Sequence, residues 1–348
     1  MKHRLTAILL LLIIFMFIML VGCDSRPPEK APMSRQYFEY FDTVSIIYSY
    51  CDESAAEFDS NCSIVENVLS EYHKLLDIYY EYDGINNLCT VNKNAGIAPV
   101  KVDRNLIDFL LYAKEMCRIT NGETNIALGS VLKLWHDRRD EGAAFPEKAS
   151  IPSQEELNTA SLHTLVDDII IDTEDSTVFL SDKDMLIDVG ALGKGYATEK
   201  ARDALVHADI TSYVLNIGGN IRAIGTKPGG NGWRTAIKDP FDKSRYALTV
   251  NISDTSCVTS GNYERYYTVG GVRYHHIIDK DTLMPADYFA SVTVFANNSA
   301  LADALSTALF CMPYEDGLAL IKGIGGAEAY WISTSGEEYM TEGVQIAE

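Results

Sequence analysis

Basic residues are scarce in this chain of 348 residues, and their scarcity excludes one large class of partner. Lysine and arginine number 29 against 49 aspartate and glutamate residues, which gives a net charge of −20. A surface of that sign repels a phosphate backbone and has few cations to replace its counterions. A nucleic-acid partner is therefore not expected. An anionic small molecule would need a local seat of backbone N–H groups, a lysine or a metal ion.

Cysteines are also few, and none is spaced as half of a metal or redox pair. The chain has seven, without a Cys-x-x-Cys motif, so a zinc or thioredoxin-like site is poorly supported. Most of the six that follow Cys23 fall in apolar periodic segments, where buried thiols are expected rather than a disulfide framework. The Walker A spacing and the Gly-x-Ser-x-Gly elbow are missing too, which argues against a P-loop protein and a serine hydrolase.

The N-terminus is typical of an export signal. Lys2 and Arg4 precede an apolar run over 5–21, which ends in a small residue and a thiol at Gly22-Cys23. This order indicates a bacterial lipoprotein signal peptide, while the length of the run leaves an uncleaved membrane anchor as the alternative. We therefore expect a chain anchored through lipid on Cys23 at the extracytoplasmic face of the cell membrane. Its expected parts are a signal peptide at 1–22, the lipidated cysteine and an extended tether at 23–40, and one domain at 41–348.

Hydrophobic periodicity predicts an α+β domain whose strands gather in its second half. Spacings of three and four residues predict helices over 58–79, 103–122, 194–207, 299–312 and 314–322, and a capping box predicts a short one after Ser153. Alternating β-branched and aromatic residues predict strands over 42–50, 168–172, 177–180, 185–188, 212–217, 221–226, 233–238, 246–252, 273–279 and 291–296. Short glycine-containing turns favour mixed or antiparallel sheets over repeated β-α-β units.

A glycine-rich turn is the first candidate site. Asp188 ends an apolar segment, and Gly190, Gly193 and Gly195 surround Lys194 where a helix is expected to begin. Free backbone N–H groups at a helix start, together with a lysine, can seat a phosphate. A turn from strand to helix also needs glycine for its shape alone. Anion binding and a purely structural turn therefore both stay open.

A second candidate is the helix expected at 299–312, where Asp303 is the one charged residue. Thr307 stands one turn further along the same side, and a carboxylate and a hydroxyl at that spacing could ligate one hard cation. A solvated helix face would carry several lysines or glutamates, whereas small residues such as Ala300 and Ser306 flank Asp303 here. A single aspartate in such surroundings indicates a compensating partner, although a surface aspartate without function is the plainer alternative.

Two adjacent histidines form the third candidate. Alternation along a strand places His275 and His276 on opposite faces, so they cannot both face one site. Histidine is the side chain best suited to move a proton near neutral pH. A histidine on a strand is more often structural, so this segment alone does not identify a base.

Taken in order, these segments resemble the ApbE family of Mg²⁺-dependent flavin transferases. The resemblance runs over roughly 41–332 and rests on several ordered motifs: LIDVGALGKGYA, VLNIGGNIRAIG, WRTAIKDP, VTSGNYERYY, YHHIID and ADALSTALF. Family members are commonly lipoproteins, in agreement with Cys23. The resemblance implies a T-fold-like α+β architecture, with mixed or antiparallel sheets, packed helices and two related halves.

The resemblance also implies an activity. Members bind FAD and move its FMN part onto a threonine or serine hydroxyl of a target protein, forming a phosphoester and releasing AMP. Implied targets are subunits of membrane redox complexes of the Rnf or Nqr type, or extracytoplasmic flavoproteins with an FMN-binding domain. Their acceptor pattern is approximately Asp-x-x-Ser/Thr-Gly-Ala-Ser/Thr. This chain contains no copy of that pattern, so self-flavinylation is not expected.

By the same resemblance, individual residues take roles. Mg²⁺ would be bound by Asp303, Thr307 and the backbone carbonyl of Ala191, and His276 would be the base that deprotonates the acceptor hydroxyl. A metal that neutralises charge on phosphorus and a positioned base suit phosphoryl transfer. The implied contacts with FAD are Phe41, Tyr82 and Ile278 along the flavin, Asp188 and Lys194 in the glycine-rich segment, and Glu123, Thr124 and Asn125.

The chain departs from the common family pattern in three places. Many members carry Met-Gly-Thr where this chain has Phe41-Asp42-Thr43, and Phe-Asp with a following Thr where it has Thr124-Asn125-Ile126-Ala127. The usual proline after the last aspartate of the HIID motif is Lys280. None of these changes touches the implied metal ligands.

Two other functions stay open. An FAD pyrophosphatase would use the same metal and phosphate groups, with water in place of the acceptor hydroxyl, and Tyr82 beside the flavin favours the transferase over it. A flavin-binding lipoprotein without catalysis would need neither a cation on the pyrophosphate nor a base. Asp303, Thr307 and His276 therefore argue against that third function.

Overall fold

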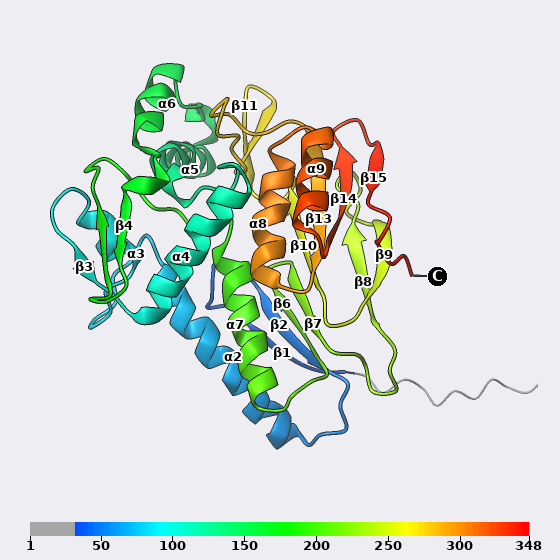
Figure 1. Ribbon diagram of the computed structural model, residues 1–348. Helices are drawn as coiled ribbons and strands as arrows, with labels where there is room; N and C mark the ends of the chain where they lie inside the picture. The colour runs from blue at the N-terminus through cyan, green and yellow to red at the C-terminus, as the bar shows by residue number, and fades with distance from the viewer. Residues whose placement is uncertain (1–31, 348) are drawn as a thin grey trace, which may run out of the picture. The chain divides into compact units, whose positions relative to one another are not determined.

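The computed structural model describes residues 32–347, and an antiparallel sheet runs through this part of the chain (Figure 1). The sheet has eight strands in the order β1-β2-β6-β7-β10-β13-β14-β15, and every neighbouring pair is antiparallel. The strands are β1 (Met33–Tyr37), β2 (Ser45–Ser49), β6 (Tyr213–Ile217), β7 (Asn220–Ile224), β10 (Ser256–Gly261), β13 (Phe289–Ala296), β14 (Ala327–Ser333) and β15 (Glu338–Met340).

Smaller antiparallel sheets complete the β-structure. One has the order β3-β5-β4, and the other two are the pairs β8-β9 and β11-β12. Their strands are β3 (Val100–Lys101), β4 (Ile169–Asp172), β5 (Thr177–Leu180), β8 (Trp233–Lys238), β9 (Tyr246–Ile252), β11 (Tyr266–Val269) and β12 (Val272–His275). The α+β class predicted from the sequence is confirmed, with antiparallel sheets throughout.

Helices cover one face of the long sheet. In Figure 1, α2 (Ala55–Leu76) and α7 (Gly193–His207) lie side by side in front of the N-terminal strands, while α8 (Ser299–Phe310) and α9 (Tyr314–Ile324) lie over the C-terminal ones. The helix α2 begins at a capping box in which Ser54 and Glu57 satisfy each other's backbone N–H groups. Its apolar residues recur every three to four positions, so the helix buries one stripe against the core.

The hairpin of β8 and β9 covers the opposite face of the sheet. Trp233 and Val250 of this hairpin pack with Cys257, Phe295 and Tyr330, which come from three strands of the long sheet. With helices on one side and the hairpin on the other, β13 is buried along its whole length. Its sequence, Phe-Ala-Ser-Val-Thr-Val-Phe-Ala, accordingly has no charged residue, and its polar Ser291 and Thr293 are buried as well.

The remaining helices and the three-stranded sheet form the left part of Figure 1. The helices are α3 (Leu88–Lys93), α4 (Arg104–Ile119), α5 (Gly129–Ala144) and α6 (Gln154–Ala160), with short 3₁₀ turns η1 (Ile126–Leu128), η2 (Pro146–Lys148), η3 (Ser161–His163) and η4 (Val166–Asp168). Asp103 caps α4 and the box of Ser153 and Glu156 caps α6, as the sequence predicts.

One predicted boundary is wrong. The extended tether was expected to reach residue 40, yet Met33–Tyr37 forms β1 and pairs in register with β2, with Tyr37 buried. The backbone groups on the side of this segment that faces β2 gain ladder partners, which a tether would leave to water. The folded domain therefore begins at Met33, eight residues before the predicted start (41 − 33 = 8).

A second correction concerns 185–188, where a strand was predicted and none forms. The alternation is present, since Met185 and Ile187 are buried, but no strand pairs with them. The side chain of Asn92 does so instead: its Oδ1 accepts from the N–H of Ile187 at 2.8 Å and its Nδ2 donates to the carbonyl of Ile187 at 3.0 Å. One amide side chain thus substitutes for a neighbouring strand.

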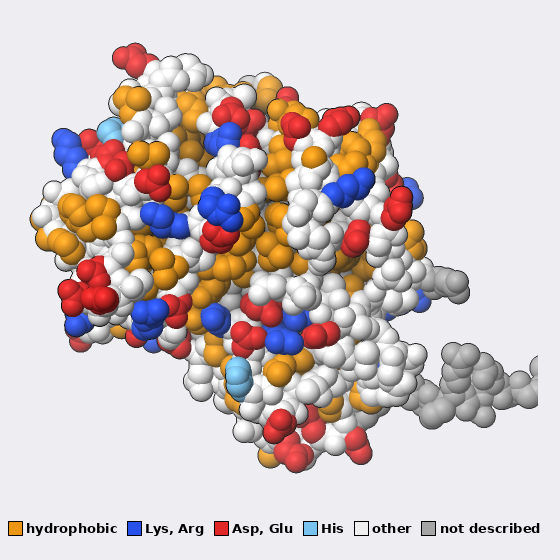
Figure 2. Space-filling view, viewed as in Figure 1, with side chains coloured by type: hydrophobic (Ala, Val, Ile, Leu, Met, Phe, Trp, Pro, Cys, Tyr) orange, Lys and Arg blue, Asp and Glu red, His pale blue; other side chains and the backbone are white. Residues whose placement is uncertain are grey.

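The predicted signal peptide, Cys23 and most of the tether lie outside the described residues. Within 32–347 no helix has both the length and the apolar character to cross a bilayer. The six cysteines from Cys51 to Cys311 are free thiols, and all but Cys51 are buried. On the face shown in Figure 2, acidic and basic side chains are interspersed, and the basic ones do not merge into a continuous patch.

A buried ion pair joins α7, β7 and the start of α8. The Nε of Arg222, a residue only 1% exposed, lies 3.2 Å from Oε2 of Glu199. The same oxygen accepts the backbone N–H of Ser299 at 2.6 Å, so Glu199 also caps α8. Arg222 donates in addition to the carbonyls of Ala223 and Asn297. Each charge therefore has a partner, which a buried charge requires.

We expect Glu199→Ala to lower the free energy of unfolding by about 3 kcal/mol, because it removes the buried partner of the Arg222 guanidinium and leaves only the half-exposed Asp254, whose Oδ1 lies 3.4 Å from Nη2. Urea denaturation followed by circular dichroism measures the change. The matched control is Glu81→Ala, which breaks the exposed pair with Lys93 and should leave the midpoint nearly unchanged. Equal midpoints for the two variants would contradict a structural role for the buried pair.

Candidate active site

The first turn of α7 is the point on which the candidate site converges. Before it, Oδ1 of Asp188 accepts the N–H of Gly190 at 2.9 Å and closes the turn that the sequence predicted. Leu192 occupies the N-cap position and has no side chain that can accept a hydrogen bond. The N–H of Gly193 donates to the carbonyl of Val189 at 2.8 Å, so the N–H groups of Lys194 and Gly195 are left for a partner from elsewhere in the chain. Lys194, in the same turn, directs its ammonium at the carbonyl of Gly190 at 3.4 Å.

That partner is Asp303 of α8. Its Oδ2 accepts the N–H of Gly195 at 2.8 Å, and the residue is only 5% exposed. A Cβ atom at position 195 would lie 2.4 Å from Cβ of Asp303 and 2.5 Å from the carbonyl oxygen of Ser299, so only glycine fits. The compensating partner that the sequence indicated for Asp303 is thus a backbone group.

Oxygen donors suited to a hard cation surround this contact. No lysine or arginine within 32–347 pairs with the Asp303 carboxylate, and no backbone N–H of that region donates to the carbonyl of Ala191. Thr307 follows Asp303 by one turn, and its Oγ1 has only a long contact of 3.5 Å with Ser260. A carboxylate, a hydroxyl and a carbonyl match the ligands that Mg²⁺ prefers. These three residues therefore fit the implied metal.

Tyr112 of α4 is a buried neighbour of the Asp303 carboxylate. Its hydroxyl is buried without a hydrogen-bond partner among the described residues. Burial, and after it the nearby carboxylate of Asp303, raises the pKa of Tyr112. Among residues 32–347 the buried Asp303 carboxylate has no ion-pair partner, which is a costly state that a bound cation would relieve.

The two histidines have separate roles, as their alternation predicts. The N–H of Ile277 donates to Nδ1 of His275, so Nε2 carries the proton and donates to the carbonyl of Ala286 at 2.8 Å. With both nitrogens engaged and its ring edge against Phe310, His275 is a structural residue. Burial lowers its pKa, so the ring stays neutral.

His276 points the other way and keeps one nitrogen available. Its Nδ1 lies 3.2 Å from the carbonyl of Arg265, which can only accept, so Nδ1 carries the proton and Nε2 has a free lone pair. Burial, with the positive charges of Arg265 and Lys194, lowers the pKa of His276 to about 3. The charge of Lys194 links His276 to the first turn of α7.

Phe41 and Tyr82 lie on either side of His73, whose ring contacts both of theirs edge-on. The third predicted flavin wall is elsewhere: Ile278 belongs to the core around Trp135, whereas Phe41 packs against the main core. The structure therefore brings Phe41 and Tyr82 together and does not bring Ile278 to them. Contact of each with a flavin stays a prediction.

The segment at 123–125 is engaged in contacts of its own. Thr124 donates from Oγ1 to the carbonyl of Ala304 in α8, and Asn125 caps η1 and donates to the carbonyl of Thr164. Glu123 pairs with Lys280 at 3.2 Å, while its other oxygen is buried without a partner. Burial raises the pKa of Glu123 against the effect of Lys280. Of the three, only Glu123 has an acceptor free for a ligand.

Sequence reasoning missed the residues that surround Asp188. Nδ1 of His136 in α5 lies 3.8 Å from Oδ2 of Asp188 and 3.2 Å from the hydroxyl of Tyr79. Burial lowers the pKa of His136, and the Asp188 carboxylate opposes that effect. Neither His136 nor Tyr79 belongs to a motif with chemistry of its own. Their contacts span 52 and 57 residues of sequence, which no local pattern signals.

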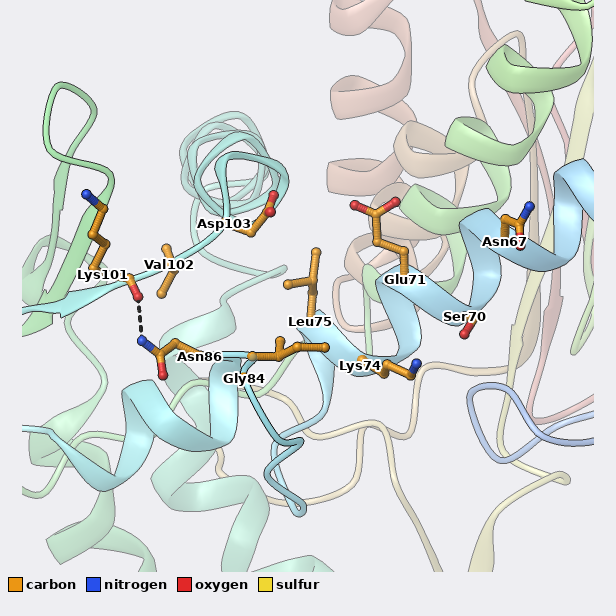
Figure 3. Close-up of a pocket in the computed structure, with 11 residues that line it drawn as sticks. Asn67, Ser70, Glu71, Lys74, Leu75, Gly84, Asn86, Lys101, Val102 and Asp103 are labelled. Carbon is orange, nitrogen blue, oxygen red and sulfur yellow. Dashed lines mark hydrogen bonds between the residues drawn. The ribbon is translucent and has the colours of Figure 1, made fainter.

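A pocket of about 490 Å³ lies beside the C-terminal half of α2, away from these groups (Figure 3). It is lined by one face of α2 and by the segments at 84–86 and 101–103, and Asn86 donates there to the carbonyl of Lys101. Its charged residues are of both signs, Lys74 and Lys101 with Glu71 and Asp103. No site residue predicted from the sequence lines it, so this pocket and the candidate chemistry do not coincide.

Comparison with known proteins gives a consistent result. A model described as the ApbE family matches residues 42–331. The chain is 33% identical over 305 residues to a protein of Treponema pallidum (strain Nichols) named FAD:protein FMN transferase, covering 83% of this chain and 82% of that one. A protein of the same name from Klebsiella pneumoniae (strain 342) is 30% identical over 289 residues, covering 82% and 84%. The crystal structure of the ApbE protein from Thermotoga maritima superposes with a TM-score of 0.78 at 27% identity, covering 90% of this chain and 97% of that one.

The contact at Gly195 predicts a sharp difference between two glycines. Gly195→Ala should lower the free energy of unfolding by about 1–3 kcal/mol, because the added methyl group meets the backbone of Ser299. Gly323→Ala, in α9 with open space around it, should raise it by about 0.5–1 kcal/mol. Urea denaturation of both variants measures these changes. An unchanged free energy of unfolding in Gly195→Ala would show that α7 and α8 are not in this contact.

The state of His276 is a second prediction. With a pKa of about 3, well below its unfolded value, the ring should be neutral with the proton on Nδ1 from pH 5 to 8. The stability that this confers is complete above the unfolded pKa and falls as the pH drops below it. Nuclear magnetic resonance of ring-¹⁵N-labelled protein, assigned with His276→Gln, measures both tautomer and titration. A charged ring at pH 6 would remove the basis for a neutral base.

Proposed function

We propose, from the premise that this chain belongs to the ApbE family, that it transfers the FMN part of FAD to a threonine or serine hydroxyl of a target protein. In the proposed reaction the acceptor oxygen attacks the FMN phosphorus, the bond from that phosphorus to the oxygen bridging to AMP breaks, and AMP leaves with that oxygen. The hydroxyl proton goes to a base. The reaction is proposed to depend on Mg²⁺ and to take place outside the cytoplasm, in keeping with the signal predicted at 1–22.

The observation that carries this proposal is the convergence on the first turn of α7. The Asp303 carboxylate, buried and without a cation of its own chain, lies at Gly195. Lys194 lies next to it in sequence, and its charge reaches His276, whose Nε2 lone pair is free. A lysine that can bind an anion and a carboxylate that can bind a cation therefore lie at one helix start, and we assign the neutral His276 to the same site.

Each group has a role that its geometry supports. Asp303, Thr307 and the carbonyl of Ala191 would hold the cation, which when bound neutralises charge on the pyrophosphate oxygens. The ammonium and the backbone N–H of Lys194, in the first turn of α7, would bind a phosphate oxygen. Nε2 of His276 would accept the proton of the acceptor hydroxyl, for which a neutral ring is required.

The experiment is to incubate the purified protein with FAD and Mg²⁺ and to follow AMP, free FMN and protein-bound flavin. One sample contains an acceptor protein with an Asp-x-x-Ser/Thr-Gly-Ala-Ser/Thr segment, and a second contains the same protein with alanine at the acceptor hydroxyl. AMP matched by covalent flavin on the intact acceptor alone is the expected result. AMP with free FMN in both samples would establish a pyrophosphatase, and FAD binding without AMP would establish a binding protein.

Two variants separate the roles within that assay. Asp303→Asn keeps an oxygen for the N–H of Gly195 but removes the charge, so AMP release should fall by on the order of 100-fold or more. His276→Gln should keep FAD affinity and lose transfer by on the order of 100-fold. The matched controls are Asp316→Asn on the exposed side of α9 and His207→Gln at the end of α7, and both should retain the full rate. Full activity in either site variant would remove that residue from the reaction.

A further inference from the structure

A strained turn stands between β1 and β2. Phe41 and Asp42 are consecutive non-glycine residues with φ of 56° and 51°, the left-handed region that costs a side-chain-bearing residue roughly 1–2 kcal/mol. Strain of this kind persists only where the surrounding structure holds it, and it gathers at ligand sites. The groups that hold this turn are therefore candidates for a role in ligand binding.

His73, in the last turn of α2, is the group that holds it. Its Nδ1 accepts the backbone N–H of Phe41 at 3.3 Å, which requires that Nδ1 carries no proton. In the neutral ring the proton is then on Nε2, which lies 3.3 Å from the hydroxyl of Tyr82 and donates to it. The Tyr82 hydroxyl donates in turn to Oδ2 of Asp77 at 2.8 Å. One imidazole thus links the strained turn to Tyr82 with both of its nitrogens.

Both ends of this chain of hydrogen bonds are anchored. Oδ1 of Asp77 accepts the N–H groups of Tyr79 and Tyr80, so the loop that carries Tyr82 is fixed at its start. Beyond the turn, Thr43 packs so closely on Gly218 that a Cβ there would meet its hydroxyl at 2.4 Å. The turn is therefore clamped between α2 and the β6-β7 hairpin.

The electrostatic effect of Asp42 on Tyr82 also indicates that the turn and the loop are close to each other. Burial and the hydrogen bond to Asp77 raise the pKa of Tyr82 to about 12, and the charge of Asp42 contributes in the same direction. The aromatic ring of Phe41 and that of Tyr82 are both edge-on to the His73 ring, at 5.7 and 6.3 Å between centroids. The two rings are thus set by one residue between them.

We infer that His73 is a positioning residue for flavin binding, which holds the Phe41 turn and the Tyr82 ring at a fixed separation before the ligand arrives. This inference rests on the proposed function, in which Phe41 and Tyr82 contact the flavin. The strain at Phe41 and Asp42 is offset in the free protein, so the flavin does not have to order this wall when it binds. His73 itself need not touch the ligand.

The test compares four variants for FAD affinity by fluorescence quenching, for kcat and KM for FAD, and for amide exchange of the 38–44 segment without ligand. His73→Ala should raise the Kd and KM for FAD about tenfold, leave kcat at saturating FAD nearly unchanged, and speed exchange at Phe41. His73→Asn keeps an acceptor where Nδ1 stands and should recover most of the affinity. Tyr82→Phe removes the hydroxyl that bonds to Nε2 of His73 and to Asp77, and it should weaken FAD binding about threefold. His207→Ala, on the exposed end of α7, is the matched control.

The outcomes separate this inference from the function on which it rests. A wild-type protein that neither binds nor turns over FAD overturns both. Wild-type binding with equal affinity in His73→Ala overturns the inference alone, as does a loss of kcat with an unchanged KM. Equal losses in His73→Ala and His73→Asn would show that an acceptor at the position of Nδ1 does not restore binding, which overturns the inference. Since His73→Asn and Tyr82→Phe both keep most of the side-chain volume, they decide the question even where the alanine variant unfolds.

Discussion

The constraint on which the rest of the structure depends is a pair of reciprocal caps between α7 and α8. Glu199 of α7 accepts the N–H of Ser299 at the start of α8, and Asp303 of α8 accepts the N–H of Gly195 at the start of α7. Each helix thus satisfies the open N-terminus of the other with a buried carboxylate. One of these carboxylates is paired with Arg222, while the other forms no ion pair within residues 32–347 and is the one to which we assign the cation.

This arrangement explains how a strongly negative protein could bind an anionic dinucleotide. An anion at the start of α7 would meet three positive groups: the helix N-terminus, Lys194 and a cation held by Asp303. At such short range these groups would outweigh the negative net charge of the rest of the surface. The antiparallel sheet carries α7 and α8 on one face and so sets their spacing. His276 follows β12 directly in the chain, and the charge of Lys194 contributes to lowering its pKa.

Local signals in the sequence were sufficient for much of the fold. The strands at 177–180, 233–238 and 246–252 were predicted with the observed bounds, because clear alternation and turn residues delimit them. The helix α5 and the strand β10 were not predicted. The former has a weak apolar stripe, and the latter reads Ser-Cys-Val-Thr-Ser-Gly, in which small polar residues face a helix rather than water. The strand predicted at 185–188 does not form for another reason. Its backbone pairs with the side chain of Asn92, which lies 95 residues away in the sequence from Ile187.

Part of the candidate site could likewise be predicted from the sequence, and part of it could not. Asp188, Lys194, Asp303 and His276 stand in motifs or in unusual surroundings and can be singled out from the sequence. Gly195 belongs to the same motif, yet the reason that it must be glycine lies 108 residues away. Because position 195 has no room for a Cβ against Ser299 and Asp303, this one glycine sets how closely the two helices approach. Any side chain there would force α7 and α8 apart and would separate the N–H of residue 195 from the Asp303 carboxylate.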